Sequence, residues 1–381
     1  MFSEKVPAVF MRGGTSKALI FHRKDLPEQA NWDNLFLSLM GSPDPYMRQL
    51  NGMGGGVSSL SKVAIIEKSA HPHADVDYTF GQVIINEAKV DYGGNCGNIS
   101  AAVGPFAISE GLIEPVEGEN IVRIFNTNTK KIIHGVFEVR NGKPVTTGDL
   151  EIPGVAGTAA PIRLDFLEPG GATTGKLLPT GNVCDELDIP SIGKIQVSMV
   201  DAANACIFVN AHDLGLRGDE LPSELNQMPE MLVLLNTVRT MASCKMGIGR
   251  SLEHAATIKT VPYICFVSPS KDAKTLSETM VQANQIDFTA RAMSNGQPHL
   301  ALPLTLSLCL GVAANITGSV VHQIAKLSPT GEQNKVRIGM PSGVLTVGAQ
   351  VQQIDGQWIA YKGSFYRTAR KLFEGFVYSF G

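Results

Sequence analysis

In Asp91-Tyr-Gly-Gly-Asn-Cys-Gly-Asn-Ile-Ser-Ala-Ala-Val-Gly-Pro-Phe-Ala-Ile108, a turn rich in glycine and asparagine runs directly into an apolar segment. Apolar side chains lie on every side of the helix predicted from Asn98 to about Glu110, and a helix without a polar face is a buried one. Its small residues would let other backbone segments pack closely around it. The stretch therefore predicts a fold in which other elements surround one central helix.

Cys96 lies in the turn just before this helix. The first backbone N–H groups of a helix have no partner within the helix, and the helix dipole adds positive partial charge there. Both effects stabilise a thiolate or a bound carboxylate. Cys96 is therefore a candidate proton carrier or nucleophile, and glycines 93, 94 and 97 would let a ligand approach the backbone. The alternative is an inert buried cysteine, because free cysteines are among the most buried residues.

The composition is that of a globular protein with a large core. The 381 residues suffice for two domains of ordinary size. Hydrophobic residues make up 44% of the chain and charged residues only 18%. The net charge of −3 gives no basic footprint for nucleic acid, and no lysine and arginine cluster indicates an anionic membrane surface. Nucleic-acid binding and membrane binding are therefore disfavoured.

The cysteines and histidines indicate reduced thiols and no metal. The six cysteines are scattered without a C-x-x-C pair, as in cytosolic proteins. The eight histidines form no set with zinc spacing, since His71-Pro-His73 alone is a weak signal. The first ten residues do not have the pattern of a signal peptide, and no run reaches the roughly 18 apolar residues of a membrane span. We therefore expect a cytoplasmic protein.

Two loops of the first half carry residues suited to chemistry. Gly13-Gly14-Thr15-Ser16 joins two apolar runs and offers N–H groups and hydroxyls to a carboxylate, although a plain hairpin needs no function. Lys62 follows a serine-rich loop and begins an apolar strand. Burial there would favour the neutral amine of a general base, whereas a lysine at a strand end usually reaches water. The glycines at 52–56 lack the spacing of a phosphate-binding loop.

Polar residues of the second half have weaker signals. Ser294 and His299 precede a second apolar helix, and His299 on spacing alone is a loop histidine more often than a ligand. Arg367, Arg370 and Lys371 are interpreted first as a solvated or ion-paired face, with carboxylate binding as the second interpretation.

Similar segments recur in the same order in the two halves of the chain. They are Ala18–Leu26 and Cys206–Leu214, Val76–Phe80 and Ile286–Ala290, and Val122–Ile124 and Val336–Ile338. An all-apolar helical stretch lies between the last two segments of each half, at 98–110 and 304–316. Offsets of about 190 to 215 residues keep this order, which indicates an internal duplication.

We therefore predict an α+β fold of two similar domains, residues 1–185 and 186–381. Each would be a strongly curved, mostly antiparallel, barrel-like sheet around one buried helix. The first domain would carry Lys62 and Cys96, and the cleft between the domains is expected to hold the active site. The helical region from about Ser223 to Met246 is predicted to be an insertion packed on the second domain.

Several motifs together resemble the 2-methylaconitate cis-trans isomerase (PrpF) family, which has a diaminopimelate epimerase-like fold. They are Met11-Arg-Gly-Gly-Thr-Ser-Lys17, Ser61-Lys-Val-Ala-Ile-Ile66, Asp75-Val-Asp-Tyr-Thr-Phe80, Gly94-Asn-Cys-Gly-Asn-Ile-Ser100, Gly104-Pro-Phe-Ala107, Val336-Arg-Ile-Gly-Met-Pro-Ser-Gly343 and Arg367-Thr-Ala-Arg370. The family also contains 2-methylitaconate Δ-isomerase and 4-oxalomesaconate tautomerase. The block from Asp75 to Ala107 resembles the methylitaconate isomerase branch.

The resemblance implies a cofactor-independent isomerase that shifts a proton along an allylic system in a small unsaturated di- or tricarboxylate. Such a shift moves a double bond or isomerises it from cis to trans. By position, Lys62 and Cys96 match the family's catalytic lysine and cysteine. The positions that match substrate contacts or would hold carboxylates are Thr15, Ser16, Lys17, Asn95, Gly97, Asn98, Ser294 and His299. A homo-oligomer is left open, as are the physiological substrate and the division of acid and base roles.

One departure from related epimerases matters. They place a second cysteine opposite the first, but the internal repeat puts the counterpart of Cys96 near Leu306 and Ser307, and Cys309 deeper in the helix. A symmetric two-thiol racemase is therefore disfavoured. Leu306 stands where family members often carry Gly or Ala, and the larger side chain would narrow the pocket.

Two rival functions come from other classes. A thiol hydrolase would need a histidine near Cys96, and its motif contains none. A non-catalytic protein that binds a carboxylate or assists a partner enzyme would not need both Lys62 and Cys96. Their joint presence favours catalysis.

Overall fold

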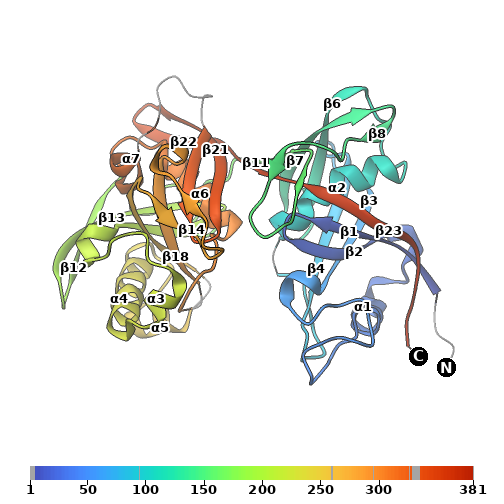
Figure 1. The fold of residues 1–381 in the computed structure, drawn as a ribbon, viewed down its shortest axis with the longest axis horizontal. Helices are drawn as coiled ribbons and strands as arrows, with labels where there is room; N and C mark the ends of the chain where they lie inside the picture. Colours follow the sequence, from blue (N-terminus) through green and yellow to red (C-terminus); the bar gives the residue numbers. More distant parts are fainter. Residues whose placement is uncertain are drawn as a thin grey trace. The chain divides into compact units, whose positions relative to one another are not determined.

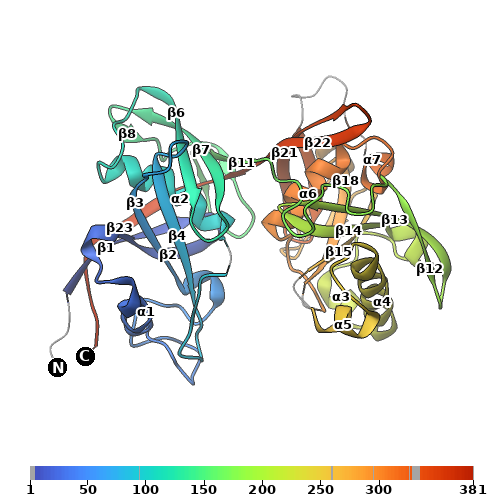
Figure 2. The ribbon, with the colours of Figure 1, turned by 180° about the vertical axis from the view of Figure 1, so that it is seen from behind.

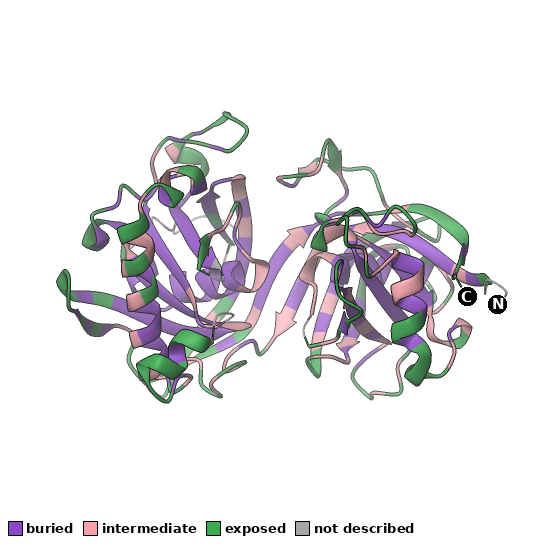
Figure 3. Cartoon of the chain, turned by 90° about the horizontal axis from the view of Figure 1, so that it is seen from below, coloured by how far each residue is buried: buried purple, intermediate pink, exposed green. Residues whose placement is uncertain are grey.

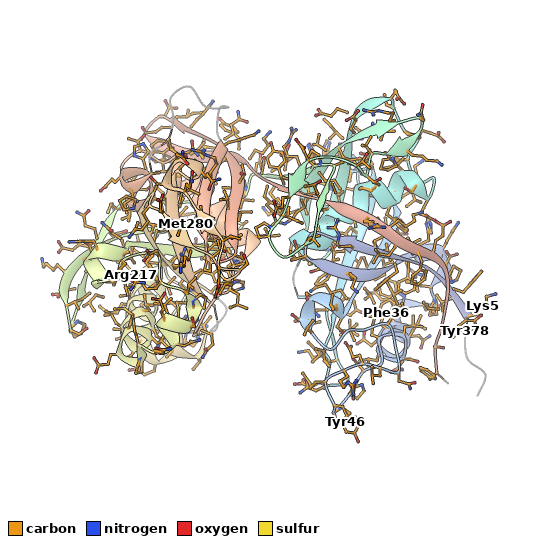
Figure 4. The ribbon with its side chains drawn as sticks, in the orientation of Figure 1. Lys5, Phe36, Tyr46, Arg217, Met280 and Tyr378 are labelled. Carbon is orange, nitrogen blue, oxygen red and sulfur yellow. The ribbon has the colours of Figure 1, made fainter. Side chains whose placement is uncertain are left out.

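A computed structural model of the chain describes residues 5–93, 95–258, 261–294, 296–325, 327 and 335–380. The chain forms two compact units, of which the first comprises Met1–Asp165 with Tyr366–Gly381 and the second Phe166–Phe365. The expected division at residue 185 differs from this one. The physical reason is that the last strand, β23 (Ala369–Tyr378), pairs with the first strand, β1 (Lys5–Gly13), so that Lys5 lies opposite Tyr378 (Figure 4).

The first unit is made mainly of strands (Figure 1). Besides β1 and β23 these are β2 (Ser16–His22), β3 (Lys62–Lys68), β4 (Val76–Val83), β5 (Val90–Asp91), β6 (Gly118–Asn126), β7 (Lys131–Arg140), β8 (Lys143–Pro144), β9 (Leu150–Glu151), β10 (Thr158–Ala159) and most of β11 (Ile162–Leu167). Its α-helices are α1 (Trp32–Met40) and α2 (Gly97–Ser109). The sheet runs in the order β23-β1-β2-β3-β4-β6-β7, in which β2–β3 and β4–β6 are parallel and the other pairs antiparallel.

Both faces of this sheet are covered, because successive side chains of a strand point to opposite faces. We call the face against α1 the outer face and the face against α2 the inner face. On the outer face, Phe21 and Leu19 pack with Phe36 of α1. On the inner face, the rings of His22 and Phe106 of α2 lie 5.1 Å apart. Phe36 lies between α1 and the sheet, whereas Tyr46 points away from it (Figure 4).

The second unit repeats this arrangement (Figures 1 and 2). Its strands are β12 (Asp185–Ile189), β13 (Gly193–Ala202), β14 (Asn204–Asn210), β15 (Tyr263–Pro269), β16 (Ala273–Lys274), β17 (Met280–Val281), β18 (Phe288–Ser294), β19 (Gln297–Pro298), β20 (Lys335–Met340), β21 (Gly343–Ile354) and most of β22 (Gln357–Arg367). Its α-helices are α3 (Pro222–Asn226), α4 (Pro229–Lys245), α5 (Leu252–Thr257), α6 (Leu304–Ala314) and α7 (Val320–Ile324).

The strand order β12-β13-β14-β15-β18-β20-β21 has parallel pairs at β14–β15 and β18–β20, at the same places as in the first unit. Helix α6 takes the place of α2. The helices between β14 and β15 take the place of α1, and Val238 and Ala242 of α4 pack with Ile207 and Phe266 of the sheet. The structure confirms the predicted α+β duplication, with a mostly antiparallel sheet around each buried helix. It also confirms that an added helical region packs on the second copy. Buried residues dominate the sheets, and exposed ones gather on loops and outer helices (Figure 3).

An ion pair at the same place in each unit fixes the register of the repeat. Arg123 donates its backbone N–H to Asp75 Oδ2 at 2.7 Å, and Arg337 does the same to Asp287 at 2.7 Å. In both pairs the guanidinium also contacts the carboxylate. The sequence comparison aligned Asp77 with Asp287 and was wrong by two residues. A shift of two leaves every side chain on the same face, so a hydrophobic pattern cannot detect it.

The two buried helices begin alike. The Ser100 hydroxyl donates to the carbonyl of Cys96, the N-cap of α2, at 3.0 Å, and the Ser307 hydroxyl donates to that of Pro303, the N-cap of α6, at 3.0 Å. Pro303 is therefore the counterpart of Cys96, and the expectation of Leu306 or Ser307 was wrong. Repeats in chains with loops of unequal length keep no constant offset, which explains the error.

Each of the two buried helices has a glycine where the sheet packs closely against it. A Cβ on Gly104 of α2 would lie 2.5 Å from the Phe137 ring on β7, and one on Gly311 of α6 would lie 2.9 Å from Val347 on β21. Only glycine lets the sheet approach each helix this closely. Among the described residues, no helix is both long and apolar enough to span a membrane.

Candidate functional site

Lys62 is the first residue of β3 and is buried, with 7% of its surface exposed. Strand register places it opposite Gln82 of β4, and its amine donates to Gln82 Oε1. The amine also lies 5.1 Å from the centre of the Phe80 ring. Gln82 is held in turn, because its amide nitrogen donates to the Ser61 carbonyl at 2.8 Å. The lysine thus does not reach out to water, and its amine is fixed on the inner face.

Cys96 caps the N-terminus of α2 in an extended conformation and is only partly buried. It differs in this from Cys206, Cys265 and Cys309, which are fully buried in the second unit. Burial raises the pKa of the Tyr78 hydroxyl well above its ordinary value, and a charge on the Cys96 thiol raises it further. The thiol is therefore within electrostatic reach of Tyr78 of β4.

Tyr78 and Phe80 connect the two candidate catalytic residues. They are two residues apart on β4, so both point to the same face, where Tyr78 is near Cys96 and Phe80 is under the Lys62 amine. Lys62 and Cys96 therefore both border one stripe of the inner face. The stripe offers a partly buried thiol and a buried amine, the equipment for two proton transfers on opposite ends of a small molecule.

The turn between β1 and β2 is fastened to the start of α2 through Asn98. The Asn98 amide donates to Thr15 Oγ1 at 3.1 Å and accepts from the Thr15 N–H at 3.4 Å. Gly14 adopts φ +50°, and a Cβ there would lie 2.1 Å from Asn98 Oδ1, so this turn requires glycine. The turn is thus attached to the start of α2 and is not an isolated hairpin.

The other residues of these two turns divide between the faces of the sheet. Ser16 is buried and has the inner-face parity of His22, whereas the Lys17 amine lies 5.6 Å from the Phe10 ring, on the outer face. Asn95 Oδ1 accepts from the Ser100 hydroxyl at 3.1 Å and so braces the turn before α2. Gly97 is the first residue of α2, and Gly94 lies outside the described residues.

Arg367 was missed as a site residue. It is buried, with 8% of its surface exposed, and its Nε donates to Asn98 Oδ1 at 3.1 Å. Burial lowers the pKa of Arg367 to about 10, opposed by the charge of Cys96, and the guanidinium remains protonated at neutral pH. The predicted solvated or ion-paired face holds for Arg370, which is exposed, and for Lys371, which pairs with Glu110 at 2.7 Å. Arg367 is buried, so the solvated part of the prediction was wrong for it.

A signal for the burial of Arg367 lay in its neighbours. Arg367 ends β22 and Arg370 lies on β23, so the two arginines belong to different strands and need not share an environment. The apolar and small residues beside Arg367, including buried Thr368 and Ala369, mark the buried side.

Ser294 and His299 belong to the second unit. Ser294 ends β18 and pairs with Gln297, while its side chain lies outside the described part of the structure. The His299 ring is half-buried, and its Nδ1 lies 2.7 Å from the Ala301 carbonyl oxygen. Burial lowers the pKa of His299, which favours the neutral ring. Leu306, expected to narrow the pocket, is fully buried at the start of α6.

Within the described ranges, no group of three or more histidine, cysteine, aspartate or glutamate side chains is placed to hold a metal ion.

Comparison with known proteins identifies the family. Residues 3–380 match the family model described as PrpF protein. The chain is 42% identical to the 2-methyl-aconitate isomerase of Cupriavidus necator, an alignment that covers 98% of this chain and 96% of the relative. It is 43% identical to the 3-methylitaconate isomerase of Eubacterium barkeri, with 98% and 97% covered.

A solved structure agrees with the sequence relatives. The crystal structure of a methylitaconate-delta-isomerase superposes with a TM-score of 0.92 at 42% identity, and the match covers 100% of this chain and 96% of that one. Sequence and fold thus agree along the whole length, and the chain belongs to the PrpF family.

Proposed function

We propose that this chain is a cofactor-independent isomerase that shifts a proton along the allylic system of a small unsaturated di- or tricarboxylate. Full-length relatives above 40% identity are named as isomerases of 2-methylaconitate and 3-methylitaconate, which supports the reaction class. The observation that carries the proposal is local. The Lys62 amine lies over Phe80 and the Cys96 thiol acts electrostatically on Tyr78, two residues away on the same face of β4.

In the proposed reaction, one of the two groups removes a proton from the carbon next to the double bond. The electron pair of that C–H bond enters the allylic system and gives a dienolate, and the other group delivers a proton to the far carbon. One C–H bond breaks and one forms, so no oxidant, reductant or leaving group is needed. The amine must be neutral to act as the base, and the thiol must be ionised to do so.

The start of α2 supplies the charge stabilisation that a dienolate needs. The free N–H groups of the first helical turn and its dipole attract a carboxylate. Fixed donors are effective because they need not reorganise when negative charge develops. Thr15, Ser16, Asn95, Gly97 and Asn98 lie in the two turns that meet there, and their backbone groups are the proposed carboxylate contacts. Lys17, whose amine lies on the outer face, would contribute through its backbone.

Ser294 and His299 are proposed to contact the substrate as well, and the candidate substrates are 2-methylaconitate, methylitaconate and 4-oxalomesaconate. The proposal includes a cytoplasmic location, supported by six cysteines that are all unpaired. Position of the double bond in the product would follow from how the pocket holds the carboxylates.

The test is to incubate the protein with each acid and with trans-aconitate and to follow the products by proton NMR. Wild type is expected to convert at least one acid, and Lys62→Ala and Cys96→Ser are expected to convert none. Ser294→Ala and His299→Ala should raise KM for that acid. If wild type binds an acid saturably and converts none, the alternative of a carboxylate-binding or accessory protein replaces the proposal.

A further inference from the structure

Arg367 is a buried cation for which the proposed proton transfers give no role. Its surface is only 8% exposed. Removing a guanidinium from water is costly unless hydrogen bonds or ion pairs compensate for the lost hydration. The location of Arg367 beside the start of α2 places its charge near the proposed reacting thiol.

Arg367 sets the orientation of the Asn98 amide. Its Nε donates to Asn98 Oδ1 at 3.1 Å, and its Nη1 donates to the Tyr366 carbonyl at 2.8 Å, which fixes the plane of the guanidinium. The Asn98 oxygen faces the donors, so its nitrogen is directed to Thr15 Oγ1 at 3.1 Å. Three segments distant in sequence thus meet at one amide.

The β1–β2 turn is shaped to admit the arginine. Gly14 has a positive φ, and a Cβ at this position would lie 3.0 Å from Arg367 Cδ as well as against Asn98. The Gly14 N–H donates to the Thr368 carbonyl at 2.9 Å, directly after the arginine. Backbone and side chain of this segment are therefore both fastened to the turn.

The ionisable groups around the Cys96 thiol differ in whether they favour a thiolate. Arg367 interacts with it electrostatically and is protonated at neutral pH. Tyr78 of β4 is near it but is fully buried and neutral. The Lys62 amine of β3 lies over Phe80, the next inner-face residue of β4, and donates to Gln82. Of these groups, Arg367 is the permanent cation placed to favour a thiolate.

The second unit provides an internal control. Its β13–β14 turn makes the corresponding backbone bond, from the Ala203 N–H to the Pro169 carbonyl at 2.7 Å. Glu168 therefore stands where Arg367 stands in the first unit, and it is exposed. At this position the first unit, whose helix begins with a cysteine, carries a buried arginine, and the second unit, whose helix begins with a proline, carries an exposed glutamate.

We propose that Arg367 is a positioning residue that holds Asn98 and keeps Cys96 available as a thiolate. The inference rests on the proposed function only in taking Cys96 as the reacting thiol. Arg367 acts on the thiol and on the β1–β2 turn, which is a proposed carboxylate contact, without itself exchanging a proton with the substrate.

The test measures the alkylation rate of Cys96 by iodoacetamide between pH 5 and pH 10, with the Cys96 peptide quantified by mass spectrometry. Arg367→Met is expected to move the rate–pH curve to higher pH by about one unit, because an adjacent opposite charge shifts a pKa by roughly 1–3 units. Alkylation at pH 7 should then be roughly tenfold slower. Arg367→Lys should restore the curve, and the matched control Arg370→Met should leave it unchanged.

Arg367→Gln separates charge from hydrogen bonding and decides the matter if the Met variant does not fold. It keeps a donor toward Asn98 but no charge, so the same displacement to higher pH is expected. A Gln or Met variant with the wild-type curve would overturn the proposal. Because alkylation needs no substrate, a displaced curve in a protein that isomerises no acid would sink the proposed function and leave this inference standing.

Discussion

The starts of α2 and α6 have the same scaffold and different chemistry. In each, a serine one turn into the helix donates to the carbonyl of the N-cap residue. In each, an amide–hydroxyl pair joins the helix to the neighbouring hairpin, Asn98 with Thr15 in one case and Asn204 with Thr305 in the other. The hydrogen-bond framework therefore belongs to the fold and does not by itself make a catalytic site.

The side chains around that framework differ at every position that the proposed reaction uses. Strand register, the helix N-caps and the hairpin hydrogen bonds identify five pairs of counterparts: Cys96 with Pro303, Lys62 with Tyr263, Gln82 with Ser294, Tyr78 with Ala290, and Arg367 with Glu168. The duplication thus gives two similar scaffolds, and the proposed acid–base groups Lys62 and Cys96 both lie in the first. The counterparts of these groups in the second unit, Tyr263 and Pro303, cannot take the same roles.

The largest effect is expected from removing the reacting groups of the first unit. Lys62→Ala and Cys96→Ser should each lower kcat/KM roughly a thousandfold, because general acid–base catalysis contributes about 10²- to 10⁴-fold. Cys244→Ser, at a partly buried cysteine on α4, is the matched control and should be neutral. Adding Pro303→Cys to the Cys96→Ser variant should restore nothing, since Tyr263 and Glu168 stand at the counterparts of Lys62 and Arg367. Restored activity would contradict the assignment of the chemistry to one unit.

A smaller effect is expected at the two amide–hydroxyl pairs. Asn98→Ala removes contacts to Thr15 and Arg367 and should lower kcat/KM roughly tenfold, since a hydrogen bond to a charged group is worth about 1.5–3 kcal/mol. Thr305→Val removes the matching contact to Asn204 and should change kcat/KM less than about twofold. Steady-state kinetics at several substrate concentrations measures both. Equal losses of kcat/KM in the two variants would show that the starts of α2 and α6 contribute equally to catalysis.

The ion pairs of the two units should differ in their effect on stability. Asp287 is buried, and Arg337→Met leaves its carboxylate without its charged partner, so about 2–3 kcal/mol of unfolding free energy should be lost. Asp75 and Arg123 are more exposed, and Arg123→Met should cost about 1 kcal/mol. Urea unfolding followed by circular dichroism gives both values. If Arg123→Met lost more unfolding free energy than Arg337→Met, burial of the carboxylate would not determine which ion pair stabilises the fold more.

The smallest effect concerns pH and His299. Burial holds its folded-state pKa below the ordinary value of 6.5, so the unfolded chain binds a proton more readily. Its contribution to stability is present above pH 6.5 and is lost as the pH falls through 6.5 toward the folded-state pKa. His299→Gln should therefore reduce the loss of urea stability between pH 7.5 and pH 5.5. If His299→Gln loses as much urea stability between pH 7.5 and pH 5.5 as wild type does, other groups cause that loss.

Much of this arrangement could be predicted from the sequence. Both central helices are apolar on all sides, and that property alone indicates burial. Cys96 at the start of a helix and Lys62 at the start of a strand were recognisable because each borders a glycine- or serine-rich loop. The repeat was visible in ordered pairs of segments, although its register was not, since a two-residue shift preserves the alternation of faces.

The parts that could not be predicted depend on contacts between distant segments. Strand β23 returns to the first unit because it pairs with β1, which no local pattern indicates. The position of Arg367 depends on the same strand pairing, which brings this residue from the C-terminal part of the chain to Asn98. A charged residue such as Arg367 does not by itself indicate burial, because its partner Asn98 is distant in the sequence.

The central claim is that Lys62 and Cys96 move the proton, and deuterium transfer tests it most directly. Wild-type protein, Lys62→Ala and Cys96→Ser would each be incubated in D₂O with the acid that wild type converts, and deuterium would be located by NMR. Wild type is predicted to place one deuterium at the far carbon of the allylic system, and neither variant should isomerise the acid. Undiminished isomerisation with deuterium uptake in either variant would contradict the account.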